Sequence, residues 1–414
     1  MRAQGSGIGG RNRARFFSSL TPAPRPLPPG VMHGNGVYGK RTRLSTKESG
    51  EPWNEGVWVI TLRDKVFGAY LGAAVGDALG GPLQAMHAER IRRLFGQINE
   101  MLPYRKPPGF FDLGPGYALH PEPGSVTDES MIRGQFAKFV ADHPHSRNVL
   151  ELVRHLLRYG DLKVWPPRMA ESLLRVQRGQ VQPETAGLSV EPGEGLGWWM
   201  AFGIANVGRP DKAASEVARL SALWKRPLEQ DLSAAVPAGI AHALTPKATA
   251  ESVIEAACAA IGPLPRRLIE RAVAIARSIP RGEVEAFVKS LYQSALVESA
   301  PDRLEGELPP PAAAPQDIEQ PTASPLLAEQ APLAFAALAF GDGRSRATLC
   351  AAAALGRDAK AIGSAVGSLI GALVGRSRLP REWVGAVIAA NRDDPDLVQQ
   401  ANELADLVEP ELTD

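Results

Sequence analysis

Cysteine is scarce in this chain of 414 residues, which contains only Cys258 and Cys350. Two cysteines cannot build a disulfide framework, and neither lies in a Cys-x-x-Cys pair or a Cys/His cluster, so disulfide-stabilised and zinc-binding classes are excluded. Such cysteine usage is typical of a reducing compartment, and we expect a cytoplasmic protein. Long hydrophobic runs are also missing, because the longest, 361–375, has 15 residues and a bilayer span needs about 18 to 20. The sequence therefore predicts no membrane partner.

Acidic residues are absent from the first 47 positions, which hold nine of the 46 lysines and arginines. The rest of the chain then has 37 basic and 45 acidic residues, a net charge of −8. A folded body with this charge is a poor surface for phosphate groups, so we expect no nucleic-acid partner. Residues 1–56 are predicted to form a disordered basic tail. Their composition also fits a transit peptide, or sequence ahead of a later start at Met32.

Segments with the alternating pattern of β-strands are hard to find, and apolar residues recur instead at helical spacing from residue 57 to 408. This pattern predicts an all-α domain over 57–408, with long loops rich in glycine and proline at 101–126 and 181–197. The clearest predicted helices are 63–79, 130–141, 149–159, 212–223, 232–243, 248–261, 265–279, 284–293, 346–355 and 361–374.

One stretch of this domain, 301–332, contains eight prolines among Ala, Glu and Gln and has almost no aromatic or β-branched residues. Such a composition lacks the apolar side chains that pack a helix or strand onto a core. It predicts a Pro/Ala-rich loop, or a flexible insertion, inside the helical domain.

Glycine recurs at every fourth position in two of the predicted helices. The two stripes are Gly68, Gly72, Gly76 and Gly80, and Gly363, Gly367, Gly371 and Gly375. Glycine destabilises a helix interior by about 1 kcal/mol relative to alanine, so its repetition needs a structural reason. Small residues allow two helix backbones to approach closely. If the stripes face each other, Asp77 and Asp358 lie near one another in the centre of the bundle.

Three short strings carry residue types that suit a catalytic site. They read Gly-Ala-Ala-Val-Gly-Asp-Ala-Leu-Gly-Gly-Pro-Leu-Gln at 72–84, Val-Thr-Asp-Glu-Ser-Met at 126–131 and Gly-Arg-Asp-Ala-Lys-Ala-Ile-Gly at 356–363. In the second string, hydroxyl and carboxylate groups stand at the start of a predicted helix, which is the ordinary way to cap a helix N-terminus. The same oxygen atoms are also ligands that Mg²⁺ prefers. The string by itself leaves both interpretations open.

In this order and spacing, the three strings resemble those of the ADP-ribosylglycohydrolase family, which includes the dinitrogenase reductase-activating glycohydrolases. The family strings read G-D-A-L-G-x-P-x-E, T-D-D-T-x-M and G-x-D-x-D-T, and the segment 203–210 is similar to the family's central segment. The resemblance covers roughly residues 61–408. It implies a single large orthogonal helical domain, two Mg²⁺ or Mn²⁺ ions, and hydrolysis of a glycosidic bond to ADP-ribose.

The chain departs from the family strings at positions that are expected to carry acids or metal ligands. Glu129 and Ser130 stand in place of an Asp and a Thr, Gln84 in place of an acid, and Lys360 and Ala361 in place of an Asp and a Thr. The substitutions at 129 and 130 keep oxygen ligands. The substitutions at 84, 360 and 361 remove them, so the resemblance is more specific for fold than for activity.

Charge counting indicates how these departures change the metal site. Asp128, Glu129 and Asp358 contribute −3 and Lys360 contributes +1, so the net charge is −2, which one divalent ion neutralises. A second ion beside an ammonium group is strongly unfavourable in a partly dry site. We therefore expect at most one Mg²⁺ or Mn²⁺ ion, or none. Lys360 is two residues from Asp358, so a solvent-facing lysine is the alternative.

The strings supply candidate residues for each role. As metal ligands we expect Thr127, Asp128, Glu129 and Asp358; as catalytic residues Asp128, Glu129, Asp358, Lys360 and Asp77; and as substrate-binding residues Gln84, Ser130, Asn206 and Trp198. Asp77 is equally consistent with a buried carboxylate that backbone amides hold in place. Trp198 is consistent with a core aromatic as well as with a wall on which a base stacks.

Two functions follow from this sequence. The first is a divergent hydrolase that acts on a ribosyl or nucleoside-type glycosidic bond with one Mg²⁺ or no metal. The second is a catalytically silent module that binds a nucleotide or ADP-ribose. Both take a small ribosyl or nucleotide-like molecule as partner, and release of ribose from ADP-ribosyl and nucleoside substrates distinguishes them.

Overall fold

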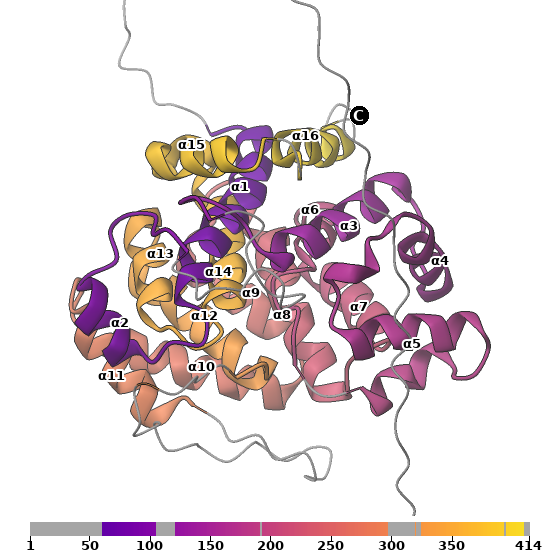
Figure 1. The fold of residues 1–414 in the computed structure, drawn as a ribbon, viewed down its shortest axis with the longest axis horizontal. Coiled ribbons are helices and arrows are strands. Elements are labelled where there is room, and N and C mark those ends of the chain that lie inside the picture. The colour runs from indigo at the N-terminus through magenta and orange to yellow at the C-terminus, as the bar shows by residue number, and fades with distance from the viewer. Residues whose placement is uncertain are drawn as a thin grey trace, which may run out of the picture. The chain divides into compact units, whose positions relative to one another are not determined.

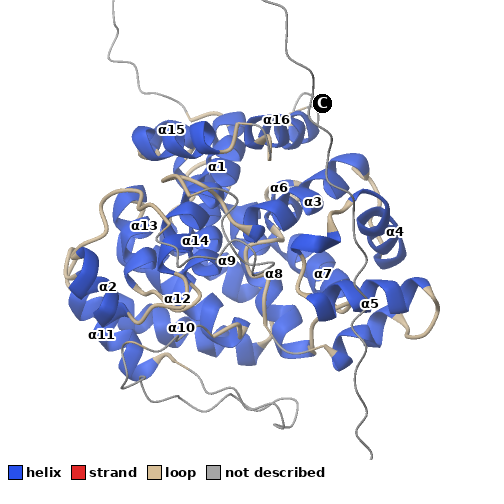
Figure 2. Cartoon of the chain, viewed as in Figure 1, coloured by secondary structure: helices blue, strands red, loops and turns tan. Residues whose placement is uncertain are grey.

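The computed structural model describes residues 60–104, 121–190, 193–296, 319, 324–392 and 395–409. Within these ranges the chain is built from helices and contains no β-strand, apart from one isolated antiparallel bridge between His87 and Gly356. The all-α prediction is therefore confirmed (Figure 2). Among the described helices, none combines the length and the apolar character that a bilayer span requires. The predicted tail at 1–56 lies outside the described residues.

All ten helices predicted from the sequence are present, with ends shifted by a few residues. The elements are α1 (Leu62–Gly80), η1 (Gly81–Leu83), α2 (Ala88–Phe95), α3 (Asp128–Asp142), α4 (Val149–Tyr159), η3 (Leu162–Val164), α5 (Pro167–Gln177), η4 (Pro183–Ser189), α6 (Met200–Ile204), α7 (Pro210–Ser221), α8 (Pro227–Ala243), α9 (Ala250–Ala259), α10 (Pro263–Ser278), α11 (Val284–Ser294), α12 (Leu327–Gly341), α13 (Ser345–Ala354), α14 (Ala359–Val374), η5 (Arg376–Arg378), α15 (Arg381–Ala390) and α16 (Leu397–Val408). Proline in the first turn begins α5, α7, α8 and α10, where its missing N–H is not needed.

Two predicted loops contain helix. The Pro/Ala-rich loop predicted at 301–332 ends earlier than expected, because α12 begins at Leu327 and runs through Pro332. Burial of Leu327 and Ala331 in the core offsets the cost of an interior proline. Most of 301–323 lies outside the described residues. The second loop, 181–197, includes the short helix η4.

The antiparallel pair α1 and α14 forms the centre of the helical domain (Figure 1). A Cβ atom on Gly72 would lie 2.3 Å from the carbonyl oxygen of Gly367, and one on Gly76 would lie 1.8 Å from that of Gly363. Backbone packs directly on backbone, so these positions have no room for a side chain. The two glycine stripes face each other, as predicted. Both helices are buried on nearly all sides, which explains why they are apolar all round.

Other helices surround this pair along its length and at one end, and the polar strings lie at the opposite end. α8, α12 and α13 pack along it, and α15 and α16 lie across the end where α1 begins (Figure 1). At the opposite end, the loop after α1 joins the loop before α14: Ala85 N donates to Arg357 O at 2.8 Å and Arg357 N donates to Met86 O at 3.0 Å. The residues that follow α1 and precede α14 are therefore held side by side.

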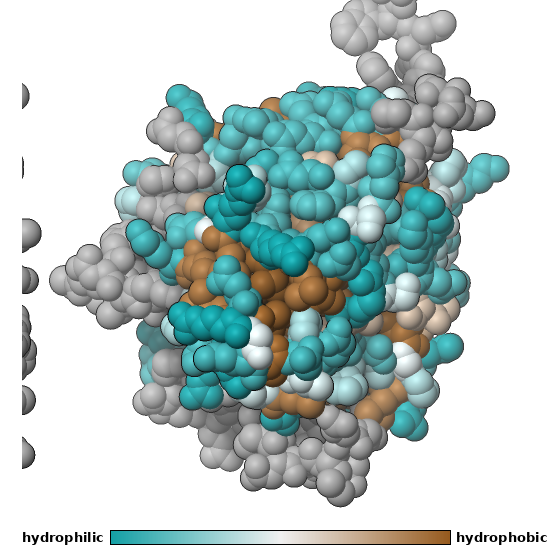
Figure 3. All heavy atoms as spheres, turned by 90° about the vertical axis from the view of Figure 1, so that its right-hand side faces the viewer, coloured by the Kyte–Doolittle hydropathy of each residue, from teal (hydrophilic) through white to brown (hydrophobic). Residues whose placement is uncertain are grey.

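The outer side that carries α4 and α5 has a hydrophobic area in its middle, surrounded by polar side chains (Figure 3). Leu150 on α4 and Leu188 on η4 belong to these outer elements and are each 48% exposed. They contrast with Leu152 on α4, which is completely buried. Leu150 therefore lies on the solvent-facing side of α4, and Leu152 lies on the side that faces the core.

Candidate functional site

Asp77, in the last turn of α1, is completely buried and joins α1 to the start of α3. Its carboxylate accepts hydrogen bonds from Thr127 N at 3.0 Å, Thr127 Oγ1 at 2.7 Å and Ser130 Oγ at 2.6 Å. Burial raises the pKa of Asp77, and the bond from Ser130 and the charge of Arg133 act in the opposite direction. These contacts hold the end of α1 against the start of α3, and the catalytic role of Asp77 stays a prediction.

Thr127 and Ser130 are also held by contacts inside the protein. Thr127 is the N-cap of α3 and its Oγ1 accepts from Glu129 N at 3.2 Å, so the capping interpretation of this string is confirmed. Ser130 Oγ accepts from Arg133 Nη2 at 2.7 Å, and Arg133 Nη1 donates to Ser364 Oγ at 2.8 Å. Ser130 therefore helps to hold Asp77, and its substrate-binding role stays a prediction.

Arg133 was not among the predicted site residues, although it is completely buried beneath the cluster. It is one turn after Ser130 on the same helix, and its guanidinium also lies 5.4 Å from the ring centroid of Tyr70. A positive charge here balances the buried Asp77. The signal that identifies it in the sequence is an arginine one turn after the polar string, among the apolar residues of the following helix.

Asp128 and Lys360 form a buried ion pair between α3 and α14. Lys360 Nζ donates to Asp128 Oδ1 at 2.6 Å. Burial alone would lower the pKa of Lys360, but the negative charges of Asp128 and Glu129 outweigh burial and raise it above its usual value. Lys360 is therefore a permanent cation inside the cluster, and the solvent-facing alternative is wrong.

Asp358 is the N-cap residue of α14, and amide groups occupy both of its oxygens. Gln84 Nε2 donates to Oδ1 at 2.9 Å and Gln330 Nε2 donates to Oδ2 at 2.7 Å. Burial and the nearby charge of Glu194 raise the pKa of Asp358 to about 7, while Lys360 and Gln84 oppose the shift. Gln84 also accepts from Lys360 N at 3.2 Å. A carboxylate at position 84 would repel Asp358, whereas an amide bridges it to α14.

Glu129 differs from these neighbours because neither of its carboxyl oxygens has a hydrogen-bond partner in the described part of the chain, although the residue is only 1% exposed. Burial raises the pKa of Glu129 well above its usual value; Lys360 opposes this, and Asp128 and Asp358 add to it. In such surroundings the neutral acid is the favoured form. Burial thus opposes the charged form of Glu129, whereas the neighbouring carboxyl groups favour the charged form of Lys360.

Two further residues near the cluster were missed in the sequence. Tyr104 covers Gly81 at the end of α1, where an added Cβ would lie 1.9 Å from the Tyr104 hydroxyl oxygen. Burial and the charges of Asp77 and Asp128 raise the pKa of Tyr104 well above its usual value. Glu194 is the second, and its charge acts on the cluster from the loop before α6. Neither residue lies in a recognised string, so only their proximity in space identifies them.

Asn206 and Trp198 belong to the packed interior. Asn206 Nδ2 donates to Glu216 Oε2 and to Phe202 O, both at 2.9 Å, and the residue is completely buried. Trp198 is buried in an aromatic cluster, with its ring centroid 5.3 Å from that of Trp165. Because aromatic side chains pack against its ring, Trp198 is a core residue. Both residues lie in the core, and their substrate-binding roles stay predictions.

The family pattern implies metal ions, and the donor atoms present here do not fit them. Lys360 donates to Asp128, amides donate to both oxygens of Asp358, and the hydroxyl of Thr127 is bonded inside the protein. Of the predicted ligands, Glu129 alone retains two unpartnered oxygens within the described ranges. Those ranges contain no group of three or more His, Cys, Asp or Glu placed to hold a metal ion. The predicted metal roles therefore lack geometric support.

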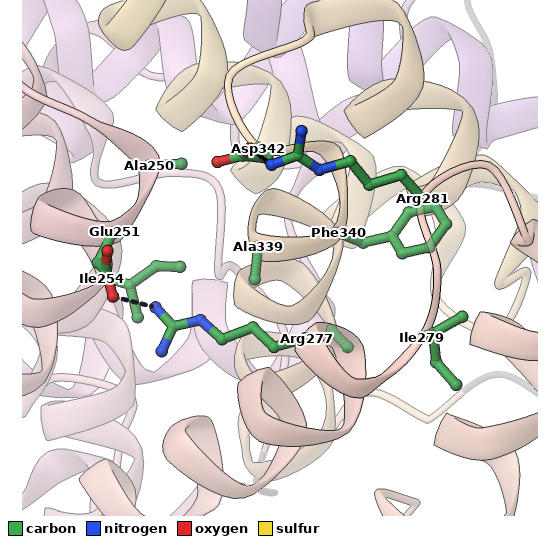
Figure 4. Close-up of a pocket in the computed structure, with 10 residues that line it drawn as sticks. Ala250, Glu251, Ile254, Arg277, Ile279, Arg281, Ala339, Phe340 and Asp342 are labelled. Carbon is green, nitrogen blue, oxygen red and sulfur yellow. Dashed lines mark hydrogen bonds and ion pairs between the residues drawn. The ribbon is translucent and has the colours of Figure 1, made fainter.

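A pocket of about 180 Å³ lies elsewhere, between α9, α10 and α12 (Figure 4). Arg277 pairs with Glu251 at 3.4 Å on one side of it, and Arg281 pairs with Asp342 on the other. None of the residues that line it belongs to the charged cluster. Because both arginines already have carboxylate partners, this pocket does not extend the candidate site.

Comparison with known proteins agrees with this geometry. The sequence profile of the ADP-ribosylglycohydrolase family matches residues 59–412. The solved structure of an "ADP-ribosylglycohydrolase-related protein complex" has a similar fold, with a TM-score of 0.56 and 20% identity over 84% of this chain and 99% of the other. No curated protein sequence matches the chain. Since the profile covers most of the length and all three strings, the chain belongs to the ADP-ribosylglycohydrolase family.

Proposed function

We propose that this protein hydrolyses a ribosyl or nucleoside-type glycosidic bond, and that Lys360 takes the place of a divalent cation in its site. The observation that carries the proposal is the buried ion pair between Lys360 and Asp128. It stands where the family strings have an additional Asp. An ammonium group held there supplies positive charge among the carboxyl groups without Mg²⁺ or Mn²⁺.

Glu129 and Asp128 are the two carboxyl groups to which we assign the chemistry. Hydrolysis of a glycosidic bond passes through an oxocarbenium-like transition state and normally uses one carboxylic acid and one carboxylate. Burial favours the neutral acid at Glu129, whose oxygens have no partner in the described ranges, so it is suited to protonate the leaving group. Asp128, held by Lys360, is suited to stabilise the positive charge on the sugar. Adjacent carboxyl groups in different environments are the expected basis for such a division of roles.

The proposal is tested by incubating the full chain with ADP-ribosyl and nucleoside compounds in EDTA, and separately with added Mg²⁺, and measuring by chromatography the ADP-ribose or ribose that is released. We expect release in EDTA. Glu129→Gln should reduce the rate at least about 100-fold, because it removes the acid. Glu184→Gln, on the exposed surface of η4, is the matched control and should leave the rate unchanged. Release that requires Mg²⁺ and stops in EDTA would contradict the proposal.

One observation favours a second candidate function, a binding module without turnover. Asp128, Glu129 and Asp358 are all buried, and Asp128 is paired with Lys360 inside the protein. A closed cluster of this kind can support a ligand that binds at the partly exposed rim, where Gln84 and Glu194 lie. Calorimetric binding of ADP-ribose with no released ribose, in either EDTA or Mg²⁺, is the result that favours this alternative.

A further inference from the structure

The loop before α6 holds a glutamate in an unusual backbone conformation. Gly193, Glu194 and Gly195 have φ values of 115°, 65° and 81°. Left-handed backbone is ordinary for glycine but strained for glutamate, and such strain persists where the surroundings impose it. A Cβ on Gly193 would lie 2.5 Å from Pro325 O, and one on Gly195 would lie 2.5 Å from the Trp198 ring. Of the three positions, only the middle one therefore accommodates a side chain.

Two other segments, one around the start of α8 and one at Pro325, hold this loop by its backbone. Gly193 N donates to Glu229 Oε2 at 3.1 Å, and Glu194 N donates to Pro325 O at 2.9 Å. The buried ammonium group of Lys225 donates to the carbonyl oxygens of both Gly193 and Glu194. The backbone N–H and C=O of Glu194 are thus both in use. The loop is built to present the side chain of Glu194.

This loop lies against the charged cluster. Pro325, which accepts the bond from Glu194, follows Ser324, and Ser324 O accepts from Gln330 Nε2 at 3.2 Å. The same amide of Gln330 donates to Asp358 Oδ2 at 2.7 Å. Burial and then the charge of Glu194 raise the pKa of Asp358 to about 7, which agrees with a short separation. Glu194 is therefore a neighbour of the site in space, although 164 positions separate it from Asp358.

Exposure distinguishes Glu194 from the other acids. Asp128, Glu129 and Asp358 are 7%, 1% and 3% exposed, whereas Glu194 is partly exposed. Gln84 is also partly exposed, but its amide nitrogen and oxygen are both bonded within the cluster. A ligand that approaches from solvent reaches the Glu194 carboxylate before the buried ones.

We propose that Glu194 is a substrate-contacting residue whose carboxylate accepts hydrogen bonds from the two adjacent hydroxyl groups of a ribosyl ring. A carboxylate has two acceptor oxygens, and hydrogen bonds to an ionised acceptor are stronger than those to a neutral one. Gln84 stands where the family strings have an acid and carries no charge, so Glu194 provides an acidic group that faces the ligand. This inference rests on the proposed function only in taking the ligand to be a ribosyl compound.

Calorimetric titration of the full chain with ribose 5-phosphate and with 2-deoxyribose 5-phosphate tests the contact, because these compounds differ by one hydroxyl group. We expect the unchanged chain to bind the ribose compound about tenfold more tightly. Glu194→Gln should bring the ratio of the two dissociation constants close to one. Glu184→Gln, an exposed control on η4, should keep the ratio of the unchanged chain.

A thermal melt of Glu194→Gly separates contact from folding. This change removes the strained side chain, so the variant should be at least as stable as the unchanged chain and still lose the discrimination between the two sugars. Equal discrimination in Glu194→Gln and the unchanged chain overturns the inference, and so does failure of the unchanged chain to bind either compound. Ribose release without Glu194-dependent discrimination overturns this inference alone. Discrimination without ribose release overturns the proposed hydrolysis alone.

Discussion

Along the α1–α14 pair, the glycine seam at Gly72 and Gly76 and the charged cluster beyond Asp77 are held together by different forces. In the seam, backbone packs on backbone and leaves no space for even one methyl group. In the cluster, side chains from distant segments bond to one another across buried charges. The seam tolerates no change of volume, whereas the cluster tolerates no change of charge. Packing is therefore expected to make the seam insensitive to pH, and buried carboxyl groups to make the cluster sensitive to it.

The largest effect is expected in the seam. Gly72→Ala would place a Cβ 2.3 Å from the backbone oxygen of Gly367, so the helices must separate. We expect the free energy of unfolding to fall by about 3 kcal/mol or more in urea titrations. The matched control is Gly385→Ala on α15, where nothing lies within 4 Å of the added Cβ. There alanine should be neutral or stabilise the helix by up to about 1 kcal/mol.

Charge removal in the cluster should have the next largest effect. Lys360→Met leaves Asp128 buried without its cation, so the free energy of unfolding should fall by roughly 3 kcal/mol in urea titrations. Lys138→Met breaks the exposed pair with Asp142 and should cost about 0.5 kcal/mol or less. Equal losses for the two variants would show that burial does not matter at Lys360.

The pH dependence follows from the raised pKa of Asp358. Its unfolded pKa is lower than about 7, so the folded state binds the proton more tightly, and this stabilisation is present at low pH and lost as pH rises through about 7. The free energy of unfolding should therefore fall by roughly 2 to 3 kcal/mol between pH 5 and pH 8 from this group. Asp358→Asn should remove that part of the slope. Asp211→Asn, exposed on α7, should not change it.

Substitutions at Lys360, Ala361 and Gln84 test whether the charged cluster can be converted into a metal-binding site. The unchanged chain should bind at most one Mn²⁺ in calorimetry, because Lys360 competes with the ion. Lys360→Asp combined with Ala361→Thr would take the site from −2 to −4 and add oxygen ligands, so the stoichiometry should rise towards two. Adding Gln84→Glu supplies the remaining acid. Two ions bound to the unchanged chain would show that Lys360 does not replace a cation.

The smallest effect is expected outside both regions. Leu150 on α4 is 48% exposed, and Leu150→Lys should change the free energy of unfolding by about 0.5 kcal/mol or less. Leu152→Lys, two residues further along the same helix, buries a charge and should destabilise the fold severely. Thermal melts of the two variants measure how far stability depends on the interior alone.

Much of the architecture was predictable because helical periodicity and glycine spacing are local properties of the chain. They identified ten of the described helices, although not α2, α5, α6, α12, α15 and α16. The four-residue spacing of Gly68 to Gly80 and Gly363 to Gly375 suggested a close helix approach, which the structure shows between α1 and α14. The prolines of 301–332 misled the prediction, since the core contacts of α12 beyond Leu327 cannot be seen in composition. The hydrogen bond from Gln330 to Asp358 was not predicted for the same reason.

The roles of the polar residues were only partly predictable. The strings predicted that Thr127, Asp128 and Asp358 lie in one site, but not what each side chain would contact. Asp77 is a structural acceptor because Thr127 and Ser130 point their donors at it. Arg133 and Glu194 stand outside the recognised strings, so motif comparison does not find them.

The sequence alone determined that this chain forms helices and that two of them carry glycine at every fourth position, because period and spacing act over a few turns. The contact between α1 and α14 comes from the folded structure. Tertiary structure decided what the polar groups do there. The ammonium of Lys360 reaches Asp128 across 232 positions of the chain, and the amide of Gln84 reaches Asp358 across 274. Whether a carboxyl group is a metal ligand, a helix cap or an acid depends on which donors and charges surround it once buried. Those neighbours come together only when the chain is folded.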